Sequence, residues 1–326
     1  MRVGLDVSPL EQTQAGTARY VRALAAIDEI ELVPLAHRGY GRLDTVYRDA
    51  VWYPLVLPRL AGRERLDVLH CPTFRGPLHR PACPLVVTVH DLAVLRHPET
   101  FNQWTRQYSR LCVSRVARAA RFVIAVSEQT KGDVVELLGV PADRIRVIPN
   151  GVADAFSPDG PAEDGDYVLA VATLEPRKNL PRLAEATRRL GVELRVAGAS
   201  GWGDVALPQD GVRTLGRVAD EELARLYRGA RCLAYPSLAE GFGIPIVEAM
   251  ASGTPVVTSR GGATEEVAGG AAVLVDPLDV ASIAAGIEET AARRAELVQA
   301  GLERARAFTW AETARRTVEV YREAAA

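Results

Sequence analysis

The sequence contains almost no lysine, because Lys131 and Lys178 are the only two and the other 37 basic residues are arginine. Aromatic residues make up 6% of the chain and the net charge is −2, a combination that argues against a nucleic-acid-binding protein. No apolar run reaches the roughly 20 residues that a transmembrane helix requires. The start, MRVGLDVSP, leads directly into a strand-like pattern, so we expect no signal peptide and a cytoplasmic protein.

Cysteine is also scarce, and the four present are Cys71, Cys83, Cys112 and Cys232. They form neither a CxxC motif nor a pair at metal-ligand spacing, so we expect reduced core residues and no metal site. The tripeptide DGD at 164–166 matches a DxD metal motif, but it precedes a strand instead of following one. We interpret it as a turn.

Charge is distributed unevenly between the two halves of the chain. Residues 1–150 carry 20 basic and 15 acidic residues, whereas residues 151–326 carry 19 and 26. A basic half joined to an acidic half indicates two domains and a face suited to an anionic partner. Ordinary variation between protein surfaces accounts for the difference equally well.

Short segments rich in Val, Ile and Leu alternate with amphipathic segments throughout the chain. This alternation is typical of a parallel sheet with helices on both faces. We expect strands at 2–7, 31–36, 67–71, 84–90, 121–126 and 144–149, and then at 167–173, 192–198, 231–237, 254–259 and 271–276.

A segment rich in Pro, Gly and Asp, residues 149–166, separates the two sets of strands and predicts a linker. The fold class is therefore α/β, with two facing doubly wound parallel-sheet (Rossmann-like) domains at 1–150 and 151–308. Ligands of such sheets bind beyond the carboxyl ends of the strands, so we expect the site in the cleft between the domains.

The segment EGFGIPIVE, residues 240–248, places an acid on each side of a glycine-rich turn. Pro245 suits the first position of a helix, so the amides of 242–246, proline excepted, are expected to point at one spot that attracts phosphate. Glu248 then suits a ribose diol, and Glu240 suits a group beyond the phosphates. Alternatively, both acids are simply favoured by the dipole of the helix.

A second cluster, TLEPRKNL at 173–180, follows an expected strand. Arg177 and Lys178 therefore lie at a carboxyl edge, where a guanidinium fork and an ammonium group suit a diphosphate. A solvated surface loop is the alternative interpretation. Asn179 is expected to begin the next helix.

The first half offers two weaker signals at strand ends. In QAGTARY, residues 14–20, Gly16 can bring backbone amides close to an anion. His90 and Asp91 follow a buried apolar strand, which is a position suited to chemistry, although a lone histidine is usually structural.

Taken in order along the chain, VSEQTKGDVVE, RIRVIPNGV, LEPRKNL and EGFGIPIVEAMASGTPVV resemble family 4 of the retaining glycosyltransferases, a group with the GT-B fold. The likeness covers nearly the whole chain, and the EGFGIPIVEAMASGTPVV block is highly specific. Within this family, the sequence most resembles bacterial mannosyltransferases and related hexosyltransferases that carry an LEPRKN turn.

The resemblance implies a role for each candidate in the second domain. Glu240 would contact the donor sugar near the reacting centre, Glu248 would bind the ribose, and Arg177 and Lys178 would bind the diphosphate and stabilise it as it leaves. Backbone contacts to sugar and phosphate would come from Gly241, Phe242, Gly243 and Ile244.

In the first domain, His90 would line the sugar and Gly16 would face the phosphates. The resemblance further implies retention of anomeric configuration, no metal and no cofactor. A last helix, 309–326, would cross back onto the N-terminal, acceptor-side domain. The donor is a nucleotide sugar, with GDP-mannose as first guess and UDP- or ADP-sugars as alternatives, and the acceptor is a small molecule, a glycan or a lipid-linked compound.

Three features depart from the family pattern. Thr173 stands where many members have an arginine, Ala15 and Gly16 replace two glycines, and the compact chain leaves little room for an acceptor-binding insertion. None of these departures removes the acids.

Several alternatives remain. The basic and aromatic helix expected at 101–120 suits either peripheral contact with an anionic membrane or a core stripe with solvated arginines. GASGWG at 198–203 lacks the spacing of a dinucleotide loop, so a dehydrogenase is disfavoured. A sugar-nucleotide 2-epimerase and a non-catalytic sugar-nucleotide sensor are the rival functions.

Overall fold

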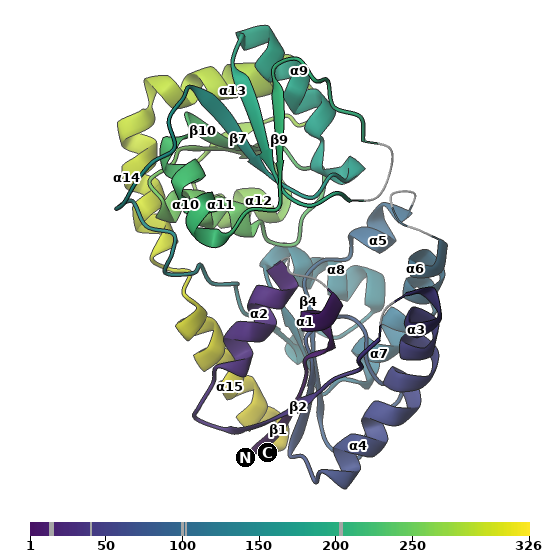
Figure 1. Ribbon diagram of the computed structural model, residues 1–326. Coiled ribbons are helices and arrows are strands. Elements are labelled where there is room, and N and C mark those ends of the chain that lie inside the picture. The colour runs from purple at the N-terminus through teal and green to yellow at the C-terminus, as the bar shows by residue number, and fades with distance from the viewer. Residues whose placement is uncertain (13–15, 40, 99–100, 102, 202–204) are drawn as a thin grey trace. The chain divides into compact units, whose positions relative to one another are not determined.

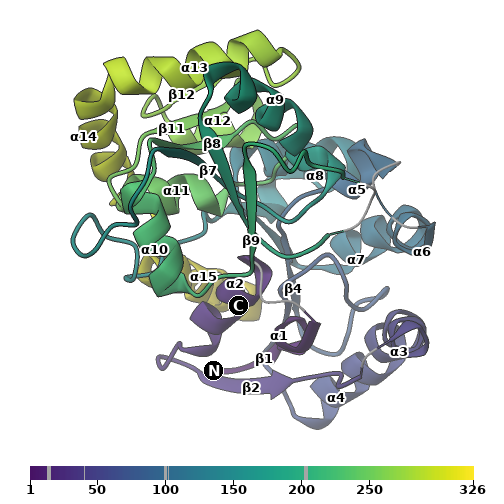
Figure 2. The same ribbon diagram turned by 45° about the horizontal axis from the view of Figure 1, so that its top comes forward.

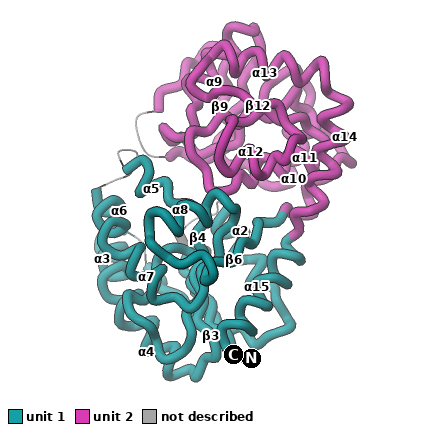
Figure 3. Tube along the Cα trace, turned by 180° about the vertical axis from the view of Figure 1, so that it is seen from behind, with its two compact units in different colours: residues 1–151, 310–326 teal, residues 152–309 magenta. Residues whose placement is uncertain are grey.

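The computed structural model describes all residues except 13–15, 40, 99–100, 102 and 202–204, and it divides into two compact units (Figure 3). Unit 1 comprises Met1–Gly151 and Trp310–Ala326, and unit 2 comprises Val152–Thr309. Ala15 of the expected phosphate turn, and Trp202 and Gly203 of the GASGWG segment, lie outside the described residues.

Unit 1 is built on a six-stranded parallel sheet (Figure 1). Its strands are β1 (Arg2–Asp6), β2 (Glu31–Leu35), β3 (Val68–Cys71), β4 (Leu85–Val89), β5 (Phe122–Ala125) and β6 (Ile145–Val147). The spatial order is β2-β1-β3-β4-β5-β6, so the direction of winding reverses between β1 and β3. In doubly wound sheets, such a reversal opens a crevice at the carboxyl ends of the two strands.

The helices of unit 1 lie on both faces of this sheet. They are α1 (Ser8–Gln12), α2 (Gly16–Ala25), α3 (Arg42–Tyr47), α4 (Leu57–Arg63), α5 (Ala93–Arg96), α6 (Gln103–Tyr108), α7 (Ser114–Ala119), α8 (Glu128–Leu138) and α15 (Trp310–Ala325). Helix α8 shows how local sequence sets the ends: Ser127 Oγ accepts the Thr130 amide at 3.0 Å, and Gly139 closes the helix at φ 65°.

Two π-helices interrupt the helical runs of unit 1. The first, η1 (Arg48–Val56), connects α3 to α4, and the second, η3 (Ser109–Val113), connects α6 to α7. Pro54 lies inside η1, where a proline removes one backbone donor and disturbs regular α-helical bonding. The helix expected at 101–120 is therefore present, but with a wider turn in its middle.

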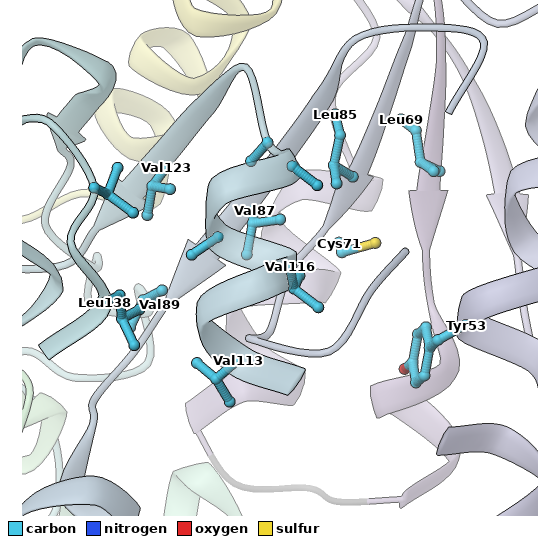
Figure 4. Close-up of a cluster of buried hydrophobic side chains, with 14 of the residues drawn as sticks. Tyr53, Leu69, Cys71, Leu85, Val87, Val89, Val113, Val116, Val123 and Leu138 are labelled. Atoms are coloured by element: carbon cyan, nitrogen blue, oxygen red, sulfur yellow. The ribbon is translucent and has the colours of Figure 1, made fainter. Parts of the chain in front are cut away.

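The core of unit 1 has two sides. On one side, Val113 and Val116 pack with residues of the central strands, among them Cys71 and Val87 (Figure 4). On the other side, Val318 and Tyr321 of α15 pack against strand residues such as Val86 and Ile124, so residues late in the chain complete the core of the first unit. Helix α15 lies beside α2 in Figure 1, and the two helices are in contact.

A buried polar network ties α15 to the sheet. Tyr321 OH and His70 Nδ1 are 2.6 Å apart, His70 Nε2 lies 2.9 Å from Thr88 Oγ1, and Tyr20 OH lies 2.8 Å from the same Thr88 oxygen. Burial lowers the pKa of His70 to about 3. The imidazole is therefore neutral at physiological pH and acts as a structural bridge.

Unit 2 is built on a second six-stranded parallel sheet. Its strands are β7 (Tyr167–Val171), β8 (Glu193–Ala197), β9 (Val212–Gly216), β10 (Cys232–Tyr235), β11 (Val256–Ser259) and β12 (Val273–Val275). The order is β12-β11-β10-β7-β8-β9, so the reversal falls between β7 and β10. The two sheets confirm the predicted α/β class with doubly wound parallel sheets.

Helices cover both faces of the second sheet, as Figure 2 shows for α9 and α13 on one side and α10 and α11 on the other. Their bounds are α9 (Leu180–Leu190), α10 (Asp220–Gly229), α11 (Ile244–Ala251), α12 (Gly262–Ala268), α13 (Val280–Ala292) and α14 (Arg294–Ala305). All four cysteines of the chain are free, as expected from their spacing.

Candidate functional site

The reversal point of the unit 2 sheet brings together two segments that are far apart in the sequence. Strand β7 leads into a 3₁₀ turn, η5 (Pro176–Lys178), and the neighbouring strand β10 leads to Glu240. The Leu238 amide donates to the Arg177 carbonyl at 2.8 Å, which joins the two loops directly. The predicted residues at these two strand ends therefore meet.

Glu240 lies between the two predicted cations. Its Oε2 accepts a hydrogen bond from Arg177 Nη1 at 2.9 Å, and its Oε1 accepts one from Lys178 Nζ at 2.5 Å. Arg177 also donates from Nε to Glu175 Oε2 at 2.9 Å, and Lys178 donates to Tyr235 OH at 2.9 Å. Two acids and two cations thus form one compact cluster.

The cluster is largely buried, and burial and neighbouring charges have opposite effects on the pKa values of its acids and of Lys178. Burial raises the pKa of Glu240, but the charges of Lys178 and Arg177 outweigh burial and bring it to about 2. Burial lowers the pKa of Lys178 against the opposing effect of Glu240, and burial raises that of Glu175. Glu240 is therefore ionised throughout the neutral pH range and holds both cations in fixed positions.

Asn179 fixes the turn that carries the cations. It adopts a left-handed conformation, φ 59°, which asparagine tolerates better than most residues. Its buried side chain donates to the carbonyls of Pro236, at 3.0 Å, and Pro277, at 2.6 Å. Asn179 precedes α9, as expected, and it also ties together the loops after β10 and β12.

The glycine turn after Glu240 leads into α11. Gly243 has φ 100°, and a Cβ at this position would approach Ile246 Cδ1 to 3.0 Å, so the turn requires glycine. Helix α11 begins at Ile244, which makes Pro245 its second residue and not its first. Gly253, at φ 71°, follows the end of the helix, as a glycine C-terminal cap does.

The set of amides available to an anion is smaller than expected. The Ile246 amide donates to the Gly243 carbonyl at 2.9 Å, so its inclusion in the phosphate-facing group was wrong. Within the described residues, no acceptor is bonded to the amides of Phe242, Gly243 and Ile244. These three amides at the helix N-terminus suit an anionic ligand.

The remaining candidates of the segment 240–248 are Glu248, Phe242 and Gly241, and the side chains of the first two are buried. Glu248 is 1% exposed, and its Oε2 accepts a hydrogen bond from Tyr227 OH at 2.9 Å. The Phe242 ring packs edge-on against Phe308, with ring centroids 5.6 Å apart, so its side chain anchors the turn. Gly241 continues the chain directly from Glu240.

Unit 1 contains the other two candidates, at the carboxyl edge of its own sheet. His90 follows β4, and its Nε2 lies 3.0 Å from the Pro72 carbonyl, which makes Nε2 the protonated nitrogen because a carbonyl only accepts. Burial lowers the pKa of His90. The Tyr20 ring of α2 contacts His90 edge-on at 4.9 Å, and Gly16 is the first residue of the same helix.

Asp91, the residue after His90, raises the pKa of His90 against the effect of burial. Its Oδ1 accepts the Ala93 amide at 3.1 Å, a local turn that starts α5. Whether the candidates of the two units share one interdomain cleft stays a prediction.

Sequence reasoning missed three members of the unit 2 site. Glu175 and Tyr235 contact the cations, and Tyr227 contacts Glu248. Glu175 could have been found, because it lies two residues before Arg177 in the same turn. Tyr227 could not, because it lies on α10 and carries no signal in its own segment.

Metal ligation finds no support in side-chain geometry. Over the described ranges, no group of three or more His, Cys, Asp or Glu side chains could hold a metal ion. Asp166 of the DGD tripeptide forms an ion pair with Arg231 at 2.6 Å, and Gly165 forms a backbone bend at φ 125°, which agrees with the interpretation of the tripeptide as a turn.

Two family matches together span most of the chain. Residues 153–306 match the family described as "Glycosyl transferases group 1", and residues 11–156 match the family described as "Glycosyltransferase Family 4". The O-antigen chain mannosyltransferase B of Escherichia coli is 31% identical over 99% of this chain and 100% of its own length.

Solved structures agree with this assignment at the level of the fold. A sucrose-phosphate synthase of Thermosynechococcus elongatus matches with a TM-score of 0.80 and 22% identity over 99% of this chain and 98% of its own. HepE of Anabaena, solved in complex with UDP and glucose, matches with a TM-score of 0.73 and 20% identity over 99% of this chain and 100% of its own. The chain therefore belongs to the family 4 glycosyltransferases and has the GT-B fold of that group.

Proposed function

We propose that the protein transfers a hexose from a nucleoside-diphosphate sugar to a hydroxyl acceptor with retention of anomeric configuration and without a metal or cofactor. The observation that carries this proposal is the cluster of Arg177, Lys178 and Glu240 at the reversal point of the unit 2 sheet. Nucleotides bind doubly wound sheets at this point, beyond the carboxyl ends of the strands.

The chemistry needs positive charge where the leaving diphosphate gains negative charge. Arg177 and Lys178 supply two cations, and the amides of Phe242, Gly243 and Ile244 add oriented donors at the N-terminus of α11. Because these groups are already held in place, they stabilise the departing diphosphate without reorganisation. The acceptor hydroxyl attacks the face from which the diphosphate leaves, which retains the configuration.

The identity of the donor sugar nucleotide is inferred more from relatives than from the side chains of this protein. The Escherichia coli relative is named a mannosyltransferase, which supports GDP-mannose as first candidate, while the Anabaena neighbour was solved with UDP, so UDP-sugars and ADP-sugars remain candidates. A glycan, small-molecule or lipid-linked hydroxyl compound is the proposed acceptor. His90 and Gly16 are proposed to face the sugar and the phosphates.

Incubation of the purified protein with GDP-mannose, UDP-glucose or ADP-glucose in the presence of EDTA tests the function. We expect slow release of the nucleoside diphosphate from one donor, and NMR of the released or transferred sugar should show the anomeric configuration of the donor. Nucleotide-sugar binding without turnover would support a sensor, and interconversion of two sugar nucleotides would support an epimerase. Either result would overturn the proposal.

Replacement of Glu248 tests donor binding separately from turnover. We expect Glu248→Ala to weaken binding of the nucleoside diphosphate by about tenfold to 100-fold, because a charged acceptor of ribose hydroxyls is lost. Isothermal titration calorimetry measures the change. Glu288→Ala, on an exposed position of α13, serves as control. Unchanged affinity in Glu248→Ala would exclude Glu248 from the ribose.

A face of unit 1 suits contact with an anionic membrane surface. Over the described residues, no helix has the length and apolar character needed to cross a bilayer. The run α6–η3–α7 nevertheless exposes Trp104 and Leu111 beside the exposed residues Arg106, Arg110 and Arg115. Residues 100–127 contain no acid, and the nearby Asp49 of η1, which accepts a hydrogen bond from Trp104 Nε1 at 3.0 Å, is itself buried.

We propose that this face rests peripherally on anionic lipid. Apolar side chains would enter the headgroup region while the arginines pair with lipid phosphates. Exposed Leu43 and Tyr47 on α3 also belong to unit 1 and add apolar surface.

Co-sedimentation with phosphatidylglycerol vesicles at low salt tests this contact. We expect Leu111→Ser to reduce the bound fraction several-fold, because burial of a leucine side chain contributes about 1.5–3 kcal/mol. Leu278→Ser in unit 2 is a matched control, since Leu111 and Leu278 are 64% and 63% exposed. Absence of wild-type binding, or equal loss in both variants, would contradict the proposal.

A further inference from the structure

A buried row of side chains in unit 1 links the C-terminal helix α15 to His90. The buried row comprises Tyr321, His70, Thr88 and Tyr20, in this order of contact. The Tyr20 ring then contacts His90. Tyr20 belongs to α2, which lies beside α15 in Figure 1 and is in contact with it. Helix α15 is thereby connected to a residue for which a role at the sugar is proposed.

Tyr20 contacts two side chains at the carboxyl end of β4 at once. Its hydroxyl oxygen lies 2.8 Å from Thr88 Oγ1, and its ring lies edge-on to His90, with centroids 4.9 Å apart and planes at 85°. Thr88 and His90 are two positions apart, the spacing at which side chains leave the same face of a strand. Tyr20 is fully buried, so its ring cannot turn away without displacing packed neighbours. The phenol therefore fills the space beside the imidazole.

His90 is hydrogen-bonded at one ring nitrogen and not at the other. Its Nε2 donates to the Pro72 carbonyl at 3.0 Å, whereas among the described residues Nδ1 has no hydrogen-bond partner. A neutral histidine that is protonated on Nε2 presents Nδ1 as an acceptor, which suits a sugar hydroxyl. A single hydrogen bond still allows the ring to pivot, and the edge-on contact with Tyr20 restricts this movement.

The hydrogen bonds of the buried row have one consistent direction. Tyr321 OH lies 2.6 Å from His70 Nδ1 and, over the described ranges, has no other partner, so its proton is donated to Nδ1. His70 Nε2 then carries the imidazole proton and donates it to Thr88 Oγ1 at 2.9 Å. Burial lowers the pKa of His70 to about 3, so the ring stays in this neutral form. Thr88 is therefore held on one side by His70 and on the other by Tyr20.

Helix α15 supports the ring of Tyr20 as well as its hydroxyl group. Trp310, the first residue of α15, contacts the Tyr20 ring with centroids 6.4 Å apart, and the His70 ring meets the Tyr20 ring edge-on at the same distance. The Tyr321 ring lies 5.5 Å from that of His70. Two side chains of α15, about three turns apart, therefore converge on Tyr20, one directly and one through His70.

We propose that Tyr20 is a positioning residue for His90, and that α15 holds Tyr20 in place through the buried row. Tyr20 sets the orientation in which His90 Nδ1 meets a sugar hydroxyl. The last helix of the chain thereby takes part in the reaction without contacting the substrate. The effect on turnover rests on the proposed transferase function, whereas the control of the His90 ring does not. A displacement of about 1 Å at a reacting group can lower a rate by about 100-fold, so loss of this support is measurable.

Removal of single hydroxyl groups tests the buried row by steady-state kinetics. Tyr20→Phe is expected to lower kcat by about tenfold and Tyr321→Phe by a smaller factor, while the donor KM stays close to wild type because the donor contacts proposed for unit 2 are intact. Tyr167→Phe is the matched control, since this fully buried tyrosine donates to the Leu226 carbonyl at 2.7 Å in unit 2. It is expected to lower Tm and to leave kcat unchanged. Circular dichroism confirms that each variant is folded.

A double-mutant cycle with His90→Ala separates positioning from general destabilisation. If Tyr20 acts through His90, Tyr20→Phe causes no further loss of kcat once His90 is alanine, although it still lowers Tm. An equal loss of kcat in both backgrounds would overturn the proposal, because Tyr20 would then act independently of His90. Wild-type kcat in both Tyr20→Phe and Tyr321→Phe would overturn it as well.

NMR of ¹⁵N-labelled histidine side chains supplies a readout that needs no activity. The chain contains five histidines, and comparison with His90→Ala assigns the signals of His90. We expect Tyr20→Phe and Tyr321→Phe to shift the His90 imidazole signals, and Tyr167→Phe to leave them unchanged. Wild-type His90 signals in both of the first two variants would overturn the proposal. Shifted signals in a protein without transferase activity would support the positioning role and count against the proposed function alone.

Discussion

Lys178→Ala is expected to lower kcat by about 10²- to 10³-fold, the range found when one preorganised donor to a developing negative charge is removed. Lys178 is nearly buried, and its Nζ is held by Glu240 Oε1 and Tyr235 OH, so its ammonium group has a fixed position from which to meet the leaving diphosphate. Alanine removes the charge and leaves no side chain that could replace it. Steady-state assay with the preferred donor measures the loss.

The chain offers a matched control, because it contains one other lysine. Lys131 lies on α8 in unit 1, half-buried and paired with Glu128 at 3.3 Å within the same helix. Lys131→Ala is expected to keep wild-type kcat, since such surface pairs contribute little. Near-normal turnover in Lys178→Ala would refute the assignment of the leaving-group site.

Glu240→Gln is expected to cause a loss of similar size, about 10²- to 10³-fold in kcat, by a different route. Glutamine keeps the shape of the side chain but cannot neutralise Arg177 and Lys178 together. Arg177 keeps its bond to Glu175 and Lys178 keeps its bond to Tyr235, but both cations are less stable where they are, because the buried charge that they shared is lost. Rates near wild type in this variant would exclude a role for the Glu240 carboxylate.

The difference in stability between wild type and Glu240→Gln is also expected to depend on pH. The folded pKa of Glu240 is about 2, below its ordinary value of 4.5, so the carboxylate stabilises the fold fully above pH 4.5 and loses this effect as pH falls towards 2. The difference in Tm between wild type and Glu240→Gln is therefore expected to be constant from pH 5 to 8 and to shrink below 4.5. A difference that grew on acidification would contradict this sign.

Glu185→Gln provides the comparison for the pH experiment. Hydrogen bonds from Arg188 and Arg189 lower the pKa of Glu185 to about 2 as well, but this acid lies on the surface of α9, where solvent screens its charge. Its replacement is expected to change Tm little at any pH. The contrast separates the effect of a low pKa from the effect of a buried, compensated charge.

The fold class was predictable because most strands are buried on both faces and appear as continuous apolar runs. Strand β9 escaped prediction because its sequence, VRTLG, is polar and half-exposed at the edge of the sheet. The run α3–η1–α4 escaped for another reason. Pro54 and the wider π-helical turn disturb the 3.6-residue periodicity by which a helix is recognised.

The candidate site was predictable as two separate strand ends, but not as a cluster. Spacing placed Arg177 and Lys178 after one strand and Glu240 after another. Only the order of strands, with β7 beside β10, shows that these residues meet across more than 60 positions of sequence.

The position of α15 bears on how the polypeptide acquires its shape during synthesis. Residues 152–309 form a contiguous unit, whereas the first unit needs Val318 and Tyr321 to cover one side of its sheet. During synthesis on a ribosome, residues 152–309 can therefore fold before α15 has been made, while one apolar face of the unit 1 sheet is still exposed. That interval of exposure is when a chaperone would be most useful to this protein.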